Sequence, residues 1–191
     1  MNTKHARSVS SVDTPTTNLF DSLVKFDFSS DNKPNADILL PSLRQSGYTL
    51  ETAIGDLVDN PLDAGADTIV ISLDVNDKDW TVSVADNGSG MDWNTLHEMM
   101  KLGSRTNHDL ETDLGAFGLG STTASLSLGR RQHVLTRDSD GELLSAAADL
   151  DEIIKLKDFK KHLDKAQQTE LELFCQTFLR WNLEVPLTGT V

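Results

Sequence analysis

Residues 86–91 are the stretch of this chain whose types and spacing most directly suggest chemistry. They read Asp86-Asn87-Gly88-Ser89-Gly90-Met91 and follow a strand-like run that ends at Asp86. Glycine has no Cβ, so Gly88 and Gly90 would let bare backbone approach a flat ligand, with the Asp86 carboxylate beside it. An Asp-Asn-Gly run is also typical of an ordinary strand-to-helix turn. Taken alone, the hexapeptide predicts either a ligand wall or a turn.

A second group of polar residues shares one face of a helix predicted to end near residue 63. Asp56 and Asn60 are four residues apart, and Asp63 follows three residues later. Such pairs are usually a solvated face, but an Asp and an Asn together also suit a cation and a water molecule. Pro61 removes a hydrogen bond of the helix and disfavours helical geometry at the preceding residue. The sequence therefore predicts either a kink or an Asn60 side chain aimed away from the ideal direction.

A third candidate is the glycine-rich run over residues 114–125, where Gly115, Gly118 and Gly120 lead into a helix of small residues. A glycine-rich loop at a helix N-terminus presents several N–H groups and the positive end of the helix dipole. This arrangement predicts a phosphate site, and the alternative is a close-packed turn.

Regular elements must position these three stretches. Apolar residues at helical spacing after Thr49, a plausible N-cap, predict the first helix. Asp92 can cap another helix that ends at Gly103, and residues 104–113 are a candidate mobile loop. The remaining elements are two hairpins, a long amphipathic helix and a strand start: residues 67–75 with 80–86, 132–137 with 142–150, 158–181, and 188–191.

Composition limits the classes of function. The chain has 191 residues and a net charge of −13, which argues against a protein that binds the nucleic-acid backbone. Nucleotides stay compatible, since N–H groups and Mg²⁺ can offset their charge locally. The lone Cys175 excludes an internal disulfide framework, and no Cys/His spacing resembles a zinc site. No apolar run is long enough to span a bilayer, so we expect a cytoplasmic protein without a membrane partner.

The domain organisation follows from the same patterns. Residues 1–28 are predicted to be a polar tail followed by an apolar docking segment that begins at residue 19. Residues 36–191 are predicted to form one domain. Its parts are a core over residues 48–150, a helical segment over 151–183 and an incomplete final strand over 187–191.

The three stretches in this order resemble the GHKL superfamily, whose ATP-binding domain is called the Bergerat fold. The superfamily includes gyrase B-type topoisomerases, ninety-kilodalton heat-shock chaperones, histidine kinases, and MutL and MORC proteins, and the MutL/MORC side is the most similar. Residues 51–66 resemble the first motif, 86–91 the second and 114–125 the lid motif. Thr188-Gly189-Thr190 resembles the Gly-Thr that precedes a late strand. The resemblance implies an α+β fold, a two-layer α/β sandwich with helices on one face of a mixed sheet.

The resemblance also implies roles. Asp86 would accept a hydrogen bond from the adenine amino group, Asn60 would ligate Mg²⁺, and Asp56 would be the general base. The other residues implied to bind the nucleotide are Asp63, Gly88, Gly90, Met91, Leu102, Gly103, Ser104, Gly115, Ala116, Phe117, Gly118, Leu119, Gly120 and Ser121. ATP and Mg²⁺ are the implied cofactors. Binding is expected to close a lid over residues 104–120 and to promote a homodimer, with the client protein or nucleic acid unspecified.

Three positions depart from the family pattern. Asp56 stands where relatives carry the longer glutamate, Thr122 where MORC-like relatives often carry lysine, and Pro61 where serine is usual. The sequence thus predicts Mg²⁺-dependent ATP binding with slow hydrolysis to ADP and phosphate. One alternative is a nucleotide-gated switch that does not hydrolyse ATP. Others are a kinase of the histidine or anti-sigma type, disfavoured because no phosphoacceptor-histidine hairpin precedes residue 50, and a truncated, non-functional fragment.

Overall fold

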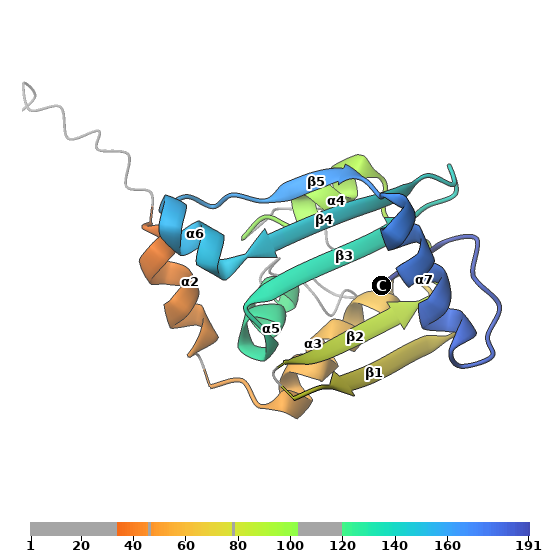
Figure 1. Cartoon of the computed structure of the whole chain (residues 1–191), viewed down its shortest axis with the longest axis horizontal. Coiled ribbons are helices and arrows are strands. Elements are labelled where there is room, and N and C mark those ends of the chain that lie inside the picture. The colour runs from red at the N-terminus through yellow and green to blue at the C-terminus, as the bar shows by residue number, and fades with distance from the viewer. Residues whose placement is uncertain (1–33, 46, 78, 103–119) are drawn as a thin grey trace, which may run out of the picture. The chain divides into compact units, whose positions relative to one another are not determined.

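A six-stranded sheet in the order β1-β2-β6-β3-β4-β5 organises the chain (Figure 1). The computed structural model describes residues 34–45, 47–77, 79–102 and 120–191. Every neighbouring pair of strands in this sheet is antiparallel. The strands are β1 (Ile69–Val75), β2 (Trp80–Asp86), β3 (Arg131–Arg137), β4 (Leu143–Asp149), β5 (His162–Lys165) and β6 (Gly189–Thr190).

The β1–β2 hairpin forms where the sequence predicts it, although Ile71, Leu73 and Val75 of β1 are exposed, and its register sets the position of Asp86. Asn76 and Asp79 close the turn: the Asn76 N–H donates to the Asp79 carbonyl, and the Asp79 N–H donates to Asn76 Oδ1, both over 2.9 Å. From that turn the ladder runs back to the pair of Ile69 with Asp86. The carboxylate therefore stands at the last ladder position of β2.

Helices pack on both faces of the sheet. Neighbouring residues of a strand point to opposite faces. Leu135 joins an apolar cluster with Phe174 of α7 (Gln168–Leu179), whereas Val134 joins one with Leu96 of α4 (Trp93–Met99). The expectation of helices on one face was therefore wrong in this respect, although the α+β class is confirmed. The helices of the described residues are α2 (Ala36–Arg44), α3 (Leu50–Asp63), α4 (Trp93–Met99), α5 (Gly120–Leu128), α6 (Leu150–Leu156) and α7 (Gln168–Leu179).

Local capping explains where the site helices begin. The Thr49 hydroxyl accepts the Thr52 N–H at the start of α3, and the Asp92 carboxylate accepts the Thr95 N–H at the start of α4. Both caps are the predicted ones. None of the helices in the described ranges is long and apolar enough to cross a membrane.

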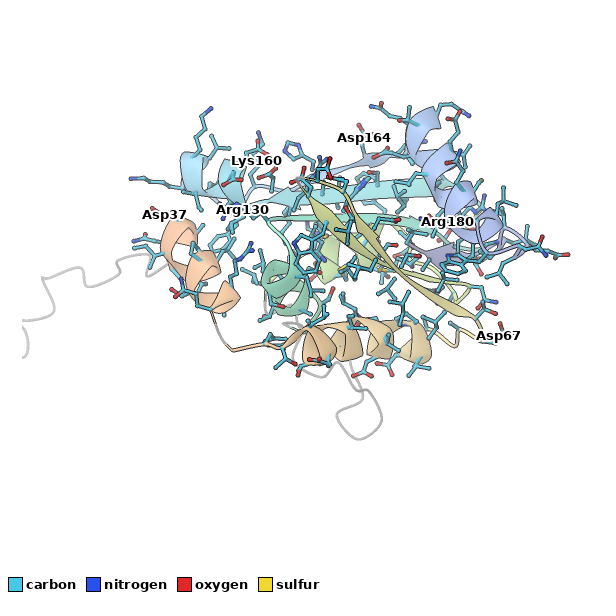
Figure 2. All side chains as sticks on the ribbon, turned by 60° about the horizontal axis from the view of Figure 1, so that its bottom comes forward. Asp37, Asp67, Arg130, Lys160, Asp164 and Arg180 are labelled. Carbon is cyan, nitrogen blue, oxygen red and sulfur yellow. The ribbon has the colours of Figure 1, made fainter. Side chains whose placement is uncertain are left out.

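The segment from residue 158 to 181 is not one long helix, as its apolar spacing had predicted. Residues His162–Lys165 form β5, which pairs with the outer edge of β4, and α7 begins only at Gln168. The physical reason is that Leu163 reaches the α4-side cluster from a strand position while its backbone completes the β4 ladder. On the other face, Arg180 near the end of α7, labelled in Figure 2, forms an ion pair with Asp74 of β1.

The centre of the sheet is paired over only a short length. β6 meets β2 at the single pair of Asp86 with Thr190, and it meets β3 at Thr136 and Arg137. Leu135 and Val191 then exchange both backbone hydrogen bonds at 2.8 Å. Beyond this point the facing edges of β2 and β3 have no strand partner in the described part of the chain. The expected mixed sheet was also wrong for the described strands, because all of their pairs are antiparallel.

Candidate functional site

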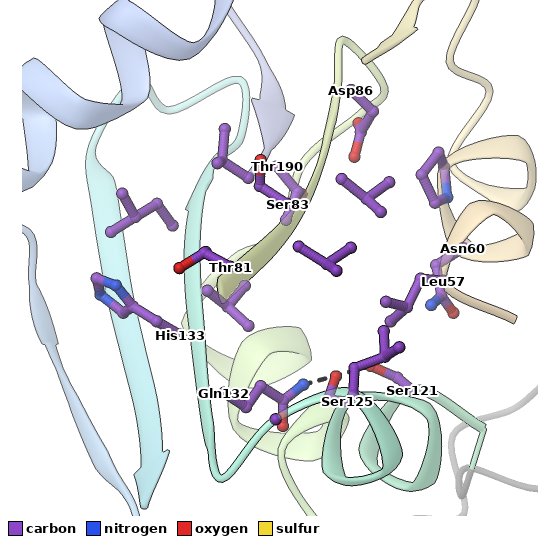
Figure 3. A pocket seen from close by; sticks show the side chains of 18 of the residues that line it. Leu57, Asn60, Thr81, Ser83, Asp86, Ser121, Ser125, Gln132, His133 and Thr190 are labelled. Atoms are coloured by element: carbon purple, nitrogen blue, oxygen red, sulfur yellow. Dashed lines mark hydrogen bonds between the residues drawn. The ribbon is translucent and has the colours of Figure 1, made fainter. Parts of the chain in front are cut away.

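One large cavity, of about 1760 Å³, lies between α3, α5 and the sheet (Figure 3). It exceeds the several hundred Å³ of a typical small-molecule site because it continues into the opening between β2 and β3. Most of the described residues predicted to form the site line it. These are Asp56, Asn60, Asp63, Asp86, Gly90, Met91, Gly120 and Ser121.

Asp86 projects into this cavity from the end of β2 (Figure 3). The residue is 4% exposed, and its Oδ1 accepts the Gly88 N–H over 2.8 Å. Burial raises the pKa of the Asp86 carboxyl above its ordinary value, because the N–H donors of Gly88 and Thr190 only partly offset the lost hydration. The site therefore holds a desolvated acceptor suited to a directional N–H donor of a ligand.

The two glycines of the hexapeptide are required by the packing of the protein itself. A Cβ on Gly88 would lie 2.9 Å from the Cβ and the carbonyl oxygen of Ala64, just beyond α3. Gly90 has φ +67°, and a Cβ there would lie 1.9 Å from the Arg137 carbonyl oxygen. The Met91 N–H then donates to Thr136 Oγ1 over 2.9 Å. The hexapeptide is thus clamped between α3 and the β3–β4 hairpin.

Thr136 and Thr190 belong to the site, although they were not among the residues predicted to form it. The Thr190 N–H is the second donor to the Asp86 carboxylate, and the two threonine hydroxyls lie 3.1 Å apart. A Cβ on Gly189 would lie 2.1 Å from the Asp86 carbonyl oxygen. The resemblance of residues 188–190 to a Gly-Thr motif was the signal that could have identified this support.

On the opposite wall, α3 presents Asp56 and Asn60. The Asn60 amide Nδ2 donates to the Asp56 carbonyl oxygen over 3.3 Å, which leaves Asn60 Oδ1 as an available hard oxygen ligand. The helix runs from Leu50 to Asp63 without interruption, and the buried Pro61 lies inside it. Asn60 therefore faces the cavity from helical backbone, one turn after Asp56 (Figure 3). Among the described residues, no three acidic, histidine or cysteine side chains gather into a metal cage.

The start of α5 closes the third side. A Cβ on Gly120 would lie 3.8 Å from Asp56 Oδ2, so the first turn of α5 approaches the acidic wall. The Ser121 hydroxyl accepts a long hydrogen bond of 3.5 Å from Gln132 Nε2. Leu102 lies elsewhere, against the cluster formed by α2 and α6. The remaining predicted residues, Gly103, Ser104 and those at positions 115–119, lie outside the described residues.

The comparison with known families shows to which family this chain belongs. Residues 48–177 match the family described as histidine kinase-, DNA gyrase B- and HSP90-like ATPase. The chain belongs to this family. The GHKL resemblance is thereby confirmed, and the family's description as ATPases is consistent with a buried acceptor, an acidic helix and a helix start around one cavity.

Two curated relatives fit the same assignment. The chain is 34% identical over 101 residues to the DNA mismatch repair protein MutL of Nostoc punctiforme, covering 53% of this GHKL chain and 16% of the relative. It is 32% identical over 91 residues to Protein MICRORCHIDIA 5 of Arabidopsis thaliana, covering 44% of the chain and 13% of the relative. The chain therefore corresponds to less than a fifth of either relative.

Proposed function

We propose that this GHKL domain binds Mg²⁺·ATP in the large cavity and hydrolyses it slowly to ADP and phosphate. The observation that carries the proposal is that Asp86 and Asp56 face one cavity from different walls. One is a buried acceptor at the end of β2, and the other is an acidic side chain beside the start of α5. The family match over residues 48–177 supports the choice of nucleotide.

Each wall would contact a different part of the ligand. Asp86 would accept a hydrogen bond from the exocyclic amino group of adenine. The first N–H groups of α5 would face the phosphates, which a helix N-terminus favours through its dipole. When bound, Mg²⁺ would neutralise phosphate charge, and Asn60 Oδ1 fits it as a single protein ligand because Mg²⁺ usually takes few protein oxygens beside phosphate and water.

In hydrolysis, Asp56 would act as the general base. A water oxygen bonds to the γ-phosphorus, the bond from that phosphorus to the bridging oxygen of ADP breaks, and the water proton passes to the Asp56 carboxylate. Aspartate is one methylene shorter than glutamate, so its reach to the water is reduced. This supports slow turnover rather than rapid turnover. We further propose that ATP closes residues 104–120 over the site and promotes a homodimer.

Calorimetric titration of Mg²⁺·ATP tests the binding proposal. We expect saturable binding by the wild type and a loss of at least tenfold in affinity for Asp86→Asn, because an amide presents one acceptor where the carboxylate presents two. Asp67→Asn is the matched control, since Asp67 is exposed and, among the described residues, its carboxylate accepts hydrogen bonds from Asn87 and Thr68. A folded wild type that does not bind, or equal binding by the Asp86 variant, would refute the proposal.

The second candidate function is a nucleotide-gated switch, which the short Asp56 side chain favours. Phosphate release by the wild type and by Asp56→Ala separates the two candidates. Hydrolysis requires that release by the variant fall to background while ATP binding persists. Equal release from both proteins, with binding intact, would favour the switch.

A further inference from the structure

Tyr48 lies outside α3 but contacts Asp56, an acidic residue on that helix. It lies one residue before the Thr49 cap of α3, and its phenol donates a hydrogen bond of 2.7 Å to Asp56 Oδ2. Tyr48 is half-buried and lines the same cavity as Asp56 and Asn60. The bond therefore spans eight residues, from the start of the helix to its middle.

The hydrogen bond from Tyr48 gives the two carboxylate oxygens of Asp56 different surroundings. Oδ2 is held by the phenol and lies near the first turn of α5, 3.8 Å from where a Gly120 Cβ would be. Oδ1 makes no hydrogen bond within the described residues. A carboxylate with one oxygen fixed and the other free to accept from water has the arrangement that general-base catalysis requires.

The phenol can act only as a donor here. The hydrogen bond to Asp56, followed by burial and the Asp56 charge, raises the pKa of Tyr48 above its ordinary value. Tyr48 therefore stays protonated across the physiological range and does not compete for the proton of the attacking water. The side chain of Asp56 is short, so its rotamer determines how far the carboxylate reaches. A hydrogen bond that fixes this rotamer therefore helps to position the carboxylate.

We propose that Tyr48 is a positioning residue for Asp56: its phenol holds Oδ2 so that Oδ1 faces the attacking water. This inference rests on the proposed ATP hydrolysis. It assigns to Tyr48 an effect on turnover and none on nucleotide affinity, since the phenol hydroxyl is engaged by the Asp56 carboxylate.

The first measurement establishes the contact without any reference to activity. Tyr48 is the chain's one tyrosine, so its phenolate absorbance can be titrated without overlap from other phenols. We expect the midpoint in the wild type to lie above that in Asp56→Ala, with circular dichroism confirming that both remain folded at each pH. Identical midpoints in the two folded proteins would overturn the proposal.

The second measurement tests the role through steady-state hydrolysis and calorimetric ATP binding. Tyr48→Phe keeps the ring and removes the hydroxyl. We expect kcat to fall about tenfold while the dissociation constant for ATP changes less than twofold. An unchanged or raised kcat in Tyr48→Phe, or a rise of more than twofold in its dissociation constant for ATP, would overturn the positioning role.

The two sets of results also separate this inference from the hydrolysis on which it rests. Equal phosphate release by the wild type and Asp56→Ala would refute hydrolysis with Asp56 as the general base, and the role of Tyr48 with it. A strong loss in Asp56→Ala, with none in Tyr48→Phe, would refute the role of Tyr48 alone.

Discussion

Close backbone contacts at single glycines fix the shape of residues 86–91, the wall proposed to face adenine. Gly90 combines a positive φ with a Cβ direction that points at the Arg137 carbonyl, so two separate restrictions apply at one residue. Gly141 has only the first of them, because φ is +81° and nothing lies within 4 Å of its would-be Cβ. The pair therefore allows backbone strain to be measured apart from steric overlap.

We predict that Gly90→Ala destabilises the fold by about 3 kcal/mol or more, since it adds overpacking to left-handed strain. Gly141→Ala should cost about 1 kcal/mol, from the strain alone. Urea unfolding followed by circular dichroism measures both. If the two variants lose equal stability, the hexapeptide is not clamped against the β3–β4 hairpin in the way described.

At the scale of elements, a small polar network ties α7 to the sheet. Glu170 Oε2 accepts the Gln167 N–H at the start of α7, while Oε1 accepts the Ser145 hydroxyl of β4 over 2.7 Å and lies 3.0 Å from His133 Nε2 of β3. Burial raises the pKa of the Glu170 carboxyl, but these donors outweigh it and hold the pKa below the ordinary value.

The lowered pKa of Glu170 makes the stability of the folded state depend on pH in a defined direction. A depressed carboxyl pKa stabilises the folded state above the unfolded value of 4.5, and the contribution is lost as the pH falls through the folded-state value. Glu170→Gln should therefore cost about 1 kcal/mol at pH 7 and progressively less below pH 4.5. Unfolding in urea at several pH values measures this. The exposed Glu172 of the same helix is the control, and an equal loss in Glu172→Gln would contradict the prediction.

An element could be predicted from the sequence where its apolar residues fit one kind of secondary structure. It could not be predicted where their spacing fits a helix and a strand equally well. The β1–β2 hairpin has alternating apolar residues on either side of a polar turn, so its two strands and the position of Asp86 at the end of the second could be predicted. Around Leu163 the spacing of apolar residues suits a helix as well as a strand, and pairing with β4 decides between them. Helix α2 carries Pro41 and no strong cap, and no element had been predicted there.

The candidate site was predictable to the extent that its residues are close in sequence. Asp56 and Asn60 share a helix turn, so their common face follows from the spacing. The contact of Tyr48 with Asp56 depends on how the chain enters α3, and the contact of Thr190 with Asp86 joins positions more than a hundred residues apart. Local patterns contain no information about such pairs.

At the scale of the whole molecule, the net charge of −13 opposes the association of two copies of the chain. Charged side chains such as Asp67, Lys160 and Asp164 lie at the periphery of the fold (Figure 2). Two copies of so acidic a chain repel each other over roughly the Debye length, which is about 30 Å at 0.01 M salt and about 10 Å at 0.1 M. Any dimer must form against this repulsion.

We therefore predict that the proposed ATP-dependent dimer is strengthened by salt. Sedimentation velocity at a fixed protein concentration, with Mg²⁺·ATP and the Asp56→Ala variant to prevent turnover, should show a larger dimer fraction at 0.3 M than at 0.05 M sodium chloride. Samples with Mg²⁺·ADP provide the control and should remain monomeric at both. A dimer that weakens as salt rises would mean that attractive ion pairs across the interface outweigh the net repulsion. Positive and negative patches on the two copies would then be complementary across the interface, despite the net acidic charge.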